Sequence, residues 1–232
     1  MKKKLAAVAL SLALAATAVT GASLAYFTDT DTAENRFTTG NVQIALQEQQ
    51  RDIAADGTVT LVEFAQDKKL IPYTGEVEDT EHRLLEKNYV DKIVNVTNTG
   101  SQDAYVRVLA TVPAAMEEAL HIDWCGPDWT VEKSDAQVTH DGHLHDVYVI
   151  TYKTVLPAGA SSQSPAMQGL LLDPHVDYRP ETGYILNGEP IGFDIGDTSI
   201  AVTAQAVQAA GFDTPAEAFA AADLSLTDWA AD

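Results

Sequence analysis

The sequence predicts an all-β protein, an antiparallel β-sandwich with short peripheral helices. Three observations favour this fold class: short segments that alternate apolar and polar residues recur along the chain, turn-forming residues separate them, and repeating strand–helix units are absent. We expect the sandwich to occupy residues 40–212. The segments expected to form its strands are 41–47, 58–64, 89–97, 104–112, 130–139, 144–155, 167–172 and 199–208.

Two pairs of these segments read as antiparallel hairpins. Segments 89–97 and 104–112 are separated by a turn around Asn98 and Gly100, and within the second segment Arg107 is expected to point outward. Segments 130–139 and 144–155 flank Asp141 and Gly142, a dipeptide that suits a type I′ turn. The sequence therefore predicts both pairs to be hydrogen-bonded neighbours.

The remaining segments are predicted to be helices and loops. Pro113 stands where it can begin a short helix that runs to Leu120. Thr214, followed by proline and then Glu217, forms a capping box that opens a second helix to about residue 222. Residues 66–86 and 173–188 are expected to be loops, and residues 213–232 a short helix and an acidic tail.

The charge of the chain excludes one class of function. It carries 14 Lys and Arg against 34 Asp and Glu, a net charge of −20. Such a surface repels polyanions, so we expect no nucleic-acid partner. The apolar content of 46% is high for a disordered acidic segment and is enough for a sizeable core.

The single cysteine limits the covalent chemistry of the chain. Cys125 cannot form an intramolecular disulfide, so it is expected to be a partly buried thiol near Trp124 and Trp129 or, alternatively, to pair between chains. Secretion without disulfides is typical of bacteria that lack an oxidising periplasm. This favours a bacterium without an outer membrane.

The N-terminus reads as an export signal. Met1–Lys4 is basic, Leu5–Val19 is apolar, and Ser23 and Ala25 supply the small residues of a cleavage site. The apolar run is about 15 residues, shorter than the roughly 20 that span a bilayer, so an uncleaved anchor is the less favoured alternative. We therefore expect residues 1–25 to be a signal peptide cut between Ala25 and Tyr26, with membrane contact only during export.

The segment around this cleavage site resembles a known group of exported proteins. Residues 21–42, Gly-Ala-Ser-Leu-Ala-Tyr-Phe-Thr-Asp-Thr-Asp-Thr-Ala-Glu-Asn-Arg-Phe-Thr-Thr-Gly-Asn-Val, are similar to the N-termini of proteins processed by a SipW-type signal peptidase, a group that includes the biofilm matrix protein TasA and camelysin. Weaker similarity continues at residues 93–101, 104–108, 156–159 and 204–209. The resemblance implies a jelly-roll-like sandwich and a secreted protein of the extracellular matrix or cell surface.

The resemblance also implies how such a protein assembles. Copies would associate into fibres by β-strand addition, in which a sandwich accepts an extended segment of another copy. Residues 26–39 would form an extended N-terminal arm, with Tyr26–Thr38 as the donor and Tyr26, Phe27 and Phe37 as its anchors. Self-association and the signal peptidase are therefore the expected partners, and assembly should respond to salt, pH or divalent cations because the subunits are acidic.

One histidine cluster is a candidate metal site. His140, His143 and His145 surround the predicted turn, and two imidazoles on one strand face could share a metal ion. A solvent-exposed hairpin tip is the favoured interpretation. We expect no resident cofactor, although weak surface binding of zinc or calcium is compatible with the sequence.

Camelysin-type proteins are described as metalloproteases, and the chain departs from that chemistry. It contains no His-Glu-x-x-His motif, and His82 with its neighbouring acids offers one imidazole only, too few for a catalytic zinc. Cys125 with His121 lacks a third, orienting group. We predict no catalytic residue. The alternatives are a secreted metal-dependent hydrolase built on the His140–His145 cluster and a monomeric adhesin or ligand-binding module.

Overall fold

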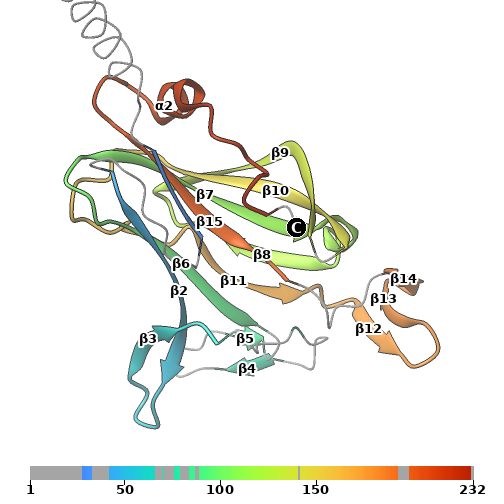
Figure 1. The fold of residues 1–232 in the computed structure, drawn as a ribbon. Helices are drawn as coiled ribbons and strands as arrows, with labels where there is room; N and C mark the ends of the chain where they lie inside the picture. Colours follow the sequence, from blue (N-terminus) through green and yellow to red (C-terminus); the bar gives the residue numbers. More distant parts are fainter. Residues whose placement is uncertain are drawn as a thin grey trace, which may run out of the picture.

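Two five-stranded antiparallel sheets pack face to face (Figure 1). The computed structural model describes residues 28–32, 42–65, 70, 76–78, 84–86, 89–140, 142–192 and 199–230. The predicted signal peptide and most of the predicted arm lie outside these residues. The all-β sandwich with a short peripheral helix is confirmed.

Sheet A contains the strands in the order β1-β15-β7-β10-β9 and sheet B in the order β3-β2-β6-β11-β8. Non-consecutive neighbours mean that the chain crosses repeatedly between the sheets. The strands of sheet A are β1 (Thr28–Thr32), β7 (Ala104–Pro113), β9 (Trp129–His140), β10 (His143–Tyr152) and β15 (Val202–Gln208). Those of sheet B are β2 (Ile44–Ile53), β3 (Val59–Glu63), β6 (Val90–Asn98), β8 (Leu120–Trp124) and β11 (Met167–Leu172).

The main core lies between the two sheets. On β7, alternate residues Val106, Val108, Ala110 and Val112 face inward and are almost completely buried. They pack in one cluster with side chains from sheet B, which include Val94, Val96, Met167 and Leu172. Burial of each such aliphatic side chain contributes about 1.5–3 kcal/mol, so this interface is the main source of stability.

Sheet A is covered on its outer face as well. Tyr105, Leu109 and Val207 point away from sheet B, yet each is at least nine-tenths buried. Helix α2 (Pro215–Ala222) packs on this face through Ala218 and Phe219, and the tail that follows adds Trp229 and Ala230 against Val138 and Val147 (Figure 1). The C-terminal segment is therefore a third layer.

The predicted pairing of residues 89–97 with 104–112 is wrong. The corresponding strands β6 and β7 lie in different sheets, so the connection between them crosses the sandwich. The buried amide of Asn98 organises this crossing: its Nδ2 donates to the carbonyls of Gln102 and Leu156, at 2.8 and 3.0 Å, and its Oδ1 accepts from the backbone N–H of Gly100. Both strands are thereby free to face each other across the core.

The other predicted hairpin is confirmed. β9 and β10 pair in antiparallel register, His140 opposite His143, and Gly142 adopts a φ of +76° that favours glycine. Trp124 and Trp129 pack at one end of the sandwich as expected, Trp124 stacked on Tyr148 and Trp129 edge-on to Tyr152.

Two helix and loop predictions need correction. Residues 113–120 contain only a single 3₁₀ turn, Ala114–Met116, because the chain enters β8 already at Leu120. Residues 173–188 are not a loop but build most of a small sheet of β12 (Val176–Arg179), β13 (Gly183–Leu186) and β14 (Glu189–Pro190). The edge-on contact of Tyr178 with Tyr184 stabilises this small sheet.

Helix α2 begins as predicted. The Thr214 hydroxyl accepts from the backbone N–H of Glu217 at 3.2 Å, and the Glu217 carboxylate accepts from the N–H of Asp213 at 3.1 Å. Asp223 ends the helix in the left-handed conformation, with φ of +48°. The chain then turns along sheet A instead of leaving the molecule.

The segment predicted as a long surface excursion, residues 66–86, lies largely outside the described residues. Within it, β4 (Glu76–Glu78) pairs with β5 (Leu84–Glu86). Next to it, the β2–β3 hairpin extends beyond the sandwich in Figure 1. Its tip exposes Ile53, Val59 and Leu61 to about half of their surface, 57%, 52% and 48%.

One close contact fixes the edge of the core in sheet B. The ring of Tyr89 lies directly over Gly169, and a Cβ at this glycine would stand 2.5 Å from Cζ of the ring. The ring cannot easily move, since its hydroxyl donates to Asp123 and the Arg51 guanidinium lies over its face. Arg51 is in turn held by an ion pair with Asp91.

We expect Gly169→Ala to lower the free energy of unfolding by about 1–3 kcal/mol, because the added methyl group overlaps the Tyr89 ring. Urea unfolding followed by circular dichroism measures this change. In a Tyr89→Ala background the same substitution should cost much less. An equal cost in both backgrounds would show that the ring contact is not the cause.

Candidate functional site

The first candidate site is the edge of sheet A formed by β1. Its five residues pair antiparallel with β15, from Thr28 opposite Val207 to Thr32 opposite Thr203. β1 is the outermost strand of the sheet, while β15 is buried over nearly its whole length. A segment that begins close to the predicted cleavage site therefore completes the sheet of its own chain.

The residues predicted to be cut or to anchor the arm are outside the described part of the chain. This holds for Ala25 and Tyr26 at the predicted cleavage site and for Phe27 and Phe37. The structure pairs Thr28–Thr32, in the first half of the predicted arm, with β15 of the sandwich.

The predicted histidine cluster lies at the tip of the β9–β10 hairpin. The rings of His140 and His145 meet edge to face with centroids 5.6 Å apart, and His143 is exposed. His145 is 1% exposed: its Nδ1 donates to the carbonyl of His143 at 3.0 Å, and its Nε2 is buried with no hydrogen-bond partner. The hairpin thus brings together two of the three imidazoles.

A metal centre requires three or more ligating side chains close together. Within the part of the chain that the structure describes, no three His, Cys, Asp or Glu residues form a group that could hold a metal ion. The described residues therefore do not fit a catalytic zinc site. The described residues also include no helix that is long and apolar enough to cross a membrane.

The structure contains a second histidine cluster, which was not predicted from the sequence. Asp173 lies between two imidazoles: His121 Nε2 is 2.6 Å from one carboxylate oxygen, and His175 Nδ1 is 2.9 Å from the other. The backbone N–H of His175 also donates to it. Residue spacing offers no signal for this cluster, because His121 is 52 positions from Asp173 and comes from the neighbouring strand β8.

Burial alone would raise the pKa of Asp173, but the hydrogen bonds from His121 and His175 outweigh it and lower the pKa to about 2. The carboxylate therefore stays charged at any ordinary pH. It joins the end of β11 to β8 and to the turn before β12.

The pairing of Cys125 with His121, which the sequence does not favour, gains no support from the structure, since His121 is engaged with Asp173. Burial raises the pKa of the Cys125 thiol, although Lys153 acts in the opposite direction. A raised pKa disfavours the thiolate that nucleophilic catalysis requires.

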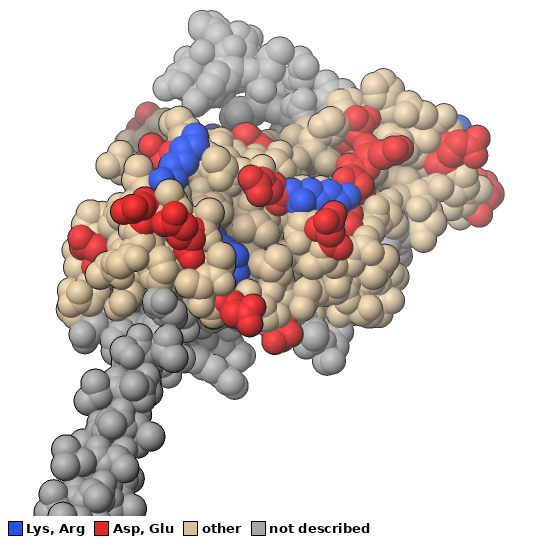
Figure 2. Space-filling model, turned by 90° about the horizontal axis from the view of Figure 1, so that it is seen from above, with Lys and Arg blue, Asp and Glu red and all other residues tan. Residues whose placement is uncertain are grey.

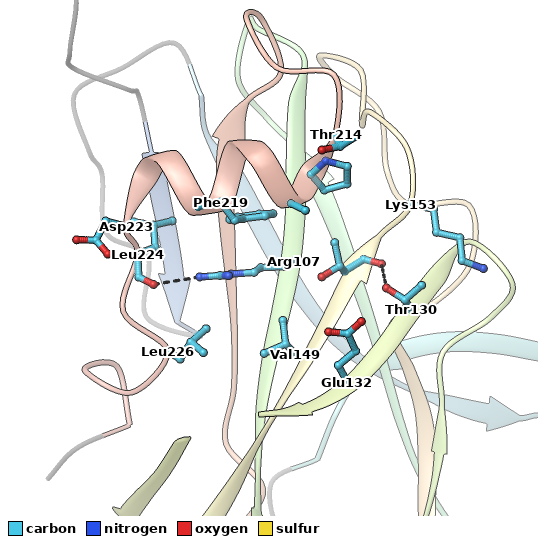
Figure 3. A pocket seen from close by; sticks show the side chains of 14 residues that line it. Arg107, Thr130, Glu132, Val149, Lys153, Thr214, Phe219, Asp223, Leu224 and Leu226 are labelled. Carbon is cyan, nitrogen blue, oxygen red and sulfur yellow. Dashed lines mark hydrogen bonds between the residues drawn. The ribbon is translucent and has the colours of Figure 1, made fainter. Parts of the chain in front are cut away.

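A further candidate site, besides the β1 edge and the two histidine clusters, is a cavity of about 590 Å³ between helix α2 and the outer face of sheet A. Figure 3 shows Arg107 lying beneath Phe219 and reaching toward Leu224. Its Nε donates to Oε1 of Gln205 at 2.8 Å and its Nη2 to the carbonyl of Leu224 at 3.1 Å. Gln205 Nε2 donates to the carbonyl of Ser225 at 2.8 Å.

Arg107 and Gln205 together form a clasp that holds the tail on the sheet. Arg107 does point outward from β7 as predicted, yet it meets the third layer instead of solvent. Its guanidinium lies 4.3 Å from the centre of the Phe219 ring, and burial lowers its pKa to about 10. The one sequence signal for this site is a single arginine within an otherwise apolar strand.

The N-terminal part of the chain is similar to a known protein family. The family model described as Camelysin metallo-endopeptidase matches residues 1–55. The matched segment covers the predicted signal peptide, the arm and β2, and none of the histidines lies in it. No curated protein and no solved structure matches the chain. The match supports the resemblance to the camelysin and TasA group over the N-terminal part of the chain.

We expect Asp173→Asn to lower the free energy of unfolding at neutral pH by up to about 1 kcal/mol, since the histidines are exposed. The pKa of Asp173 is lowered from 3.8 to about 2 in the folded chain, so its contribution is present above about pH 4 and disappears as the pH falls toward 2. The difference between variant and parent should therefore shrink over that range.

Urea unfolding of both proteins between about pH 7 and pH 2 measures this difference. Glu181→Gln, an exposed acid on the neighbouring turn, serves as the control and should not change stability. A difference that stays constant down to pH 2 would contradict the assignment.

Proposed function

We propose that the chain is a secreted structural protein of the extracellular matrix or cell surface, and that copies assemble by exchange of the N-terminal strand. The observation that carries this proposal is the position of β1 at the edge of sheet A, where β15 is its one partner among the described strands. In an assembly the same backbone hydrogen bonds would be made by β1 of another copy, and the edge of β15 would be equally satisfied.

The proposal is supported by the weakness of this strand relative to its neighbour. β1 contributes five residues of pairing, whereas β15 pairs over its full length with β7 and is buried on both faces. Removing β1 would leave a row of unpaired N–H and C=O groups beside a buried strand, which is a template for another strand. The exchanged strand makes the same backbone hydrogen bonds as the chain's own β1. The monomer and the strand-exchanged assembly therefore differ little in free energy.

The charge of the subunits would control the assembly. Asp and Glu side chains are spread over the face shown in Figure 2, with few Lys and Arg among them. With a net charge of −20 per chain, copies repel one another at low ionic strength. Salt, calcium or low pH would therefore promote association.

A catalytic function is not part of the proposal. The sequence has no His-Glu-x-x-His motif, and the described residues offer no zinc site. The protease activity in the family's name is therefore not proposed for this chain.

The test compares chains that begin at Tyr26 and at Gly40 by size-exclusion chromatography with light scattering, across pH and calcium concentration. We expect concentration-dependent oligomers from the longer chain and none from the shorter one. Thr30→Pro in the longer chain removes a backbone donor in the centre of β1 and should abolish assembly, while Thr30→Ser should not.

If the chain from Gly40 assembles as well as the chain from Tyr26, strand exchange is not the mechanism. If both remain monomeric under all conditions, the protein is a monomeric binding module and the structural proposal fails.

A further inference from the structure

The cavity under α2 has a charged floor and an apolar wall. Arg107 lies at the floor, and the wall includes Val149, Phe219, Leu224 and Leu226 (Figure 3). Glu132, Lys153 and Asp223 also line the cavity, but each is exposed. Arg107 is therefore the one charge of the cavity that is substantially removed from water.

The charge of Arg107 has no counter-ion in the described part of the chain. No ion pair links it to an Asp or Glu, and its two hydrogen bonds go to the neutral oxygens of Gln205 and Leu224. A desolvated cation is costly unless an anion compensates it, and this chain has more than twice as many acids as bases. An arginine that lacks an acidic partner in such a composition requires another explanation.

The guanidinium of Arg107 also has N–H donors that are free to bind a ligand. A guanidinium has more N–H groups than these two bonds use. Nη1 has no hydrogen bond with the described residues, and it is not among their buried unpartnered atoms, so it remains accessible. Phe219 covers one face of the guanidinium plane, which fixes its orientation.

We propose that this cavity binds a small organic acid, with its carboxylate on Arg107 and its apolar body against Phe219, Val149 and Leu226. A carboxylate would supply the missing counter-charge and accept from the free Nη1–H, the charge-assisted geometry in which arginine binds anions most strongly. A volume of about 590 Å³ is within the range of small-molecule sites. Thr30 of β1 pairs with Gln205, which in turn pairs with Arg107, so the site lies two strands from the edge of sheet A. The proposal is argued from Arg107 and the cavity and does not rest on the proposed assembly.

The test uses phenylacetate as the probe and the full chain as the protein. Titration is followed by ¹H–¹⁵N NMR, with the Arg107 Nε–H and the amides of α2 as reporters. We expect saturable shifts at these positions with a dissociation constant on the order of 1 mM. Phenylacetamide, which has the same shape and no charge, should bind at least about tenfold more weakly.

Two variants keep the test decisive. Arg107→Gln removes the charge and should weaken phenylacetate binding by at least about tenfold, but it also alters the clasp on the tail. Ala216→Phe fills the cavity from an exposed position of α2 and leaves the clasp intact, so it should block binding in a folded protein. Arg51→Lys, at an arginine already paired with Asp91, is the control and should bind normally.

Absence of saturable shifts in the parent protein would overturn the proposal. Equal binding of phenylacetamide would overturn the role of the carboxylate, and unchanged binding by Ala216→Phe would overturn the assignment to this cavity. If phenylacetate instead changes the molecular mass in light scattering without shifting the Arg107 signal, the acid acts at another surface and the proposal is wrong.

Discussion

The structure depends on the double burial of sheet A. Apart from Arg107, β7 and β15 carry apolar or uncharged side chains on both faces, so one layer of partners cannot shield them from water. Sheet B covers the inner face, and α2 with the tail covers the outer one. The capping box at Thr214, the left-handed turn at Asp223 and the clasp by Arg107 and Gln205 all serve to bring this third layer onto the sheet. The position of each candidate site follows from this arrangement.

Local signals in the sequence predicted the local structure. Period-two alternation identified most of the strands, Asp141-Gly142 identified the β9–β10 turn, and Thr214 with Glu217 identified α2. These features depend on residues close together in the chain. The failed hairpin prediction concerns partners distant in sequence: the β6–β7 connection crosses the sandwich because Asn98 bonds to Leu156, which is 58 positions away. A short turn by itself does not distinguish a hairpin from such a crossing.

The candidate sites, too, differ in whether their residues are close together in the sequence or are brought together only by the fold. The histidines of one hairpin were visible as a group because they are neighbours in the chain. His121, Asp173 and His175 were not, since two sheet partners bring them together, and the outward arginine on β7 gave no hint that a tail would cover it. Residues 213–232 were predicted to be a short helix and an acidic tail, whereas Leu224 and Trp229 give this tail an apolar side that packs on the sheet.

The placement of the tryptophans gives each layer its own optical reporter. Trp129 is 3% exposed in the main core, and its Nε1 donates to the carbonyl of Ser164. Trp229 lies in the tail, where its indole donates to Leu226 over sheet A. Detachment of α2 and the tail from sheet A exposes Trp229 to water and leaves Trp129 buried, whereas global unfolding exposes both. Fluorescence from single-tryptophan versions of the chain therefore separates the order in which the layers come apart.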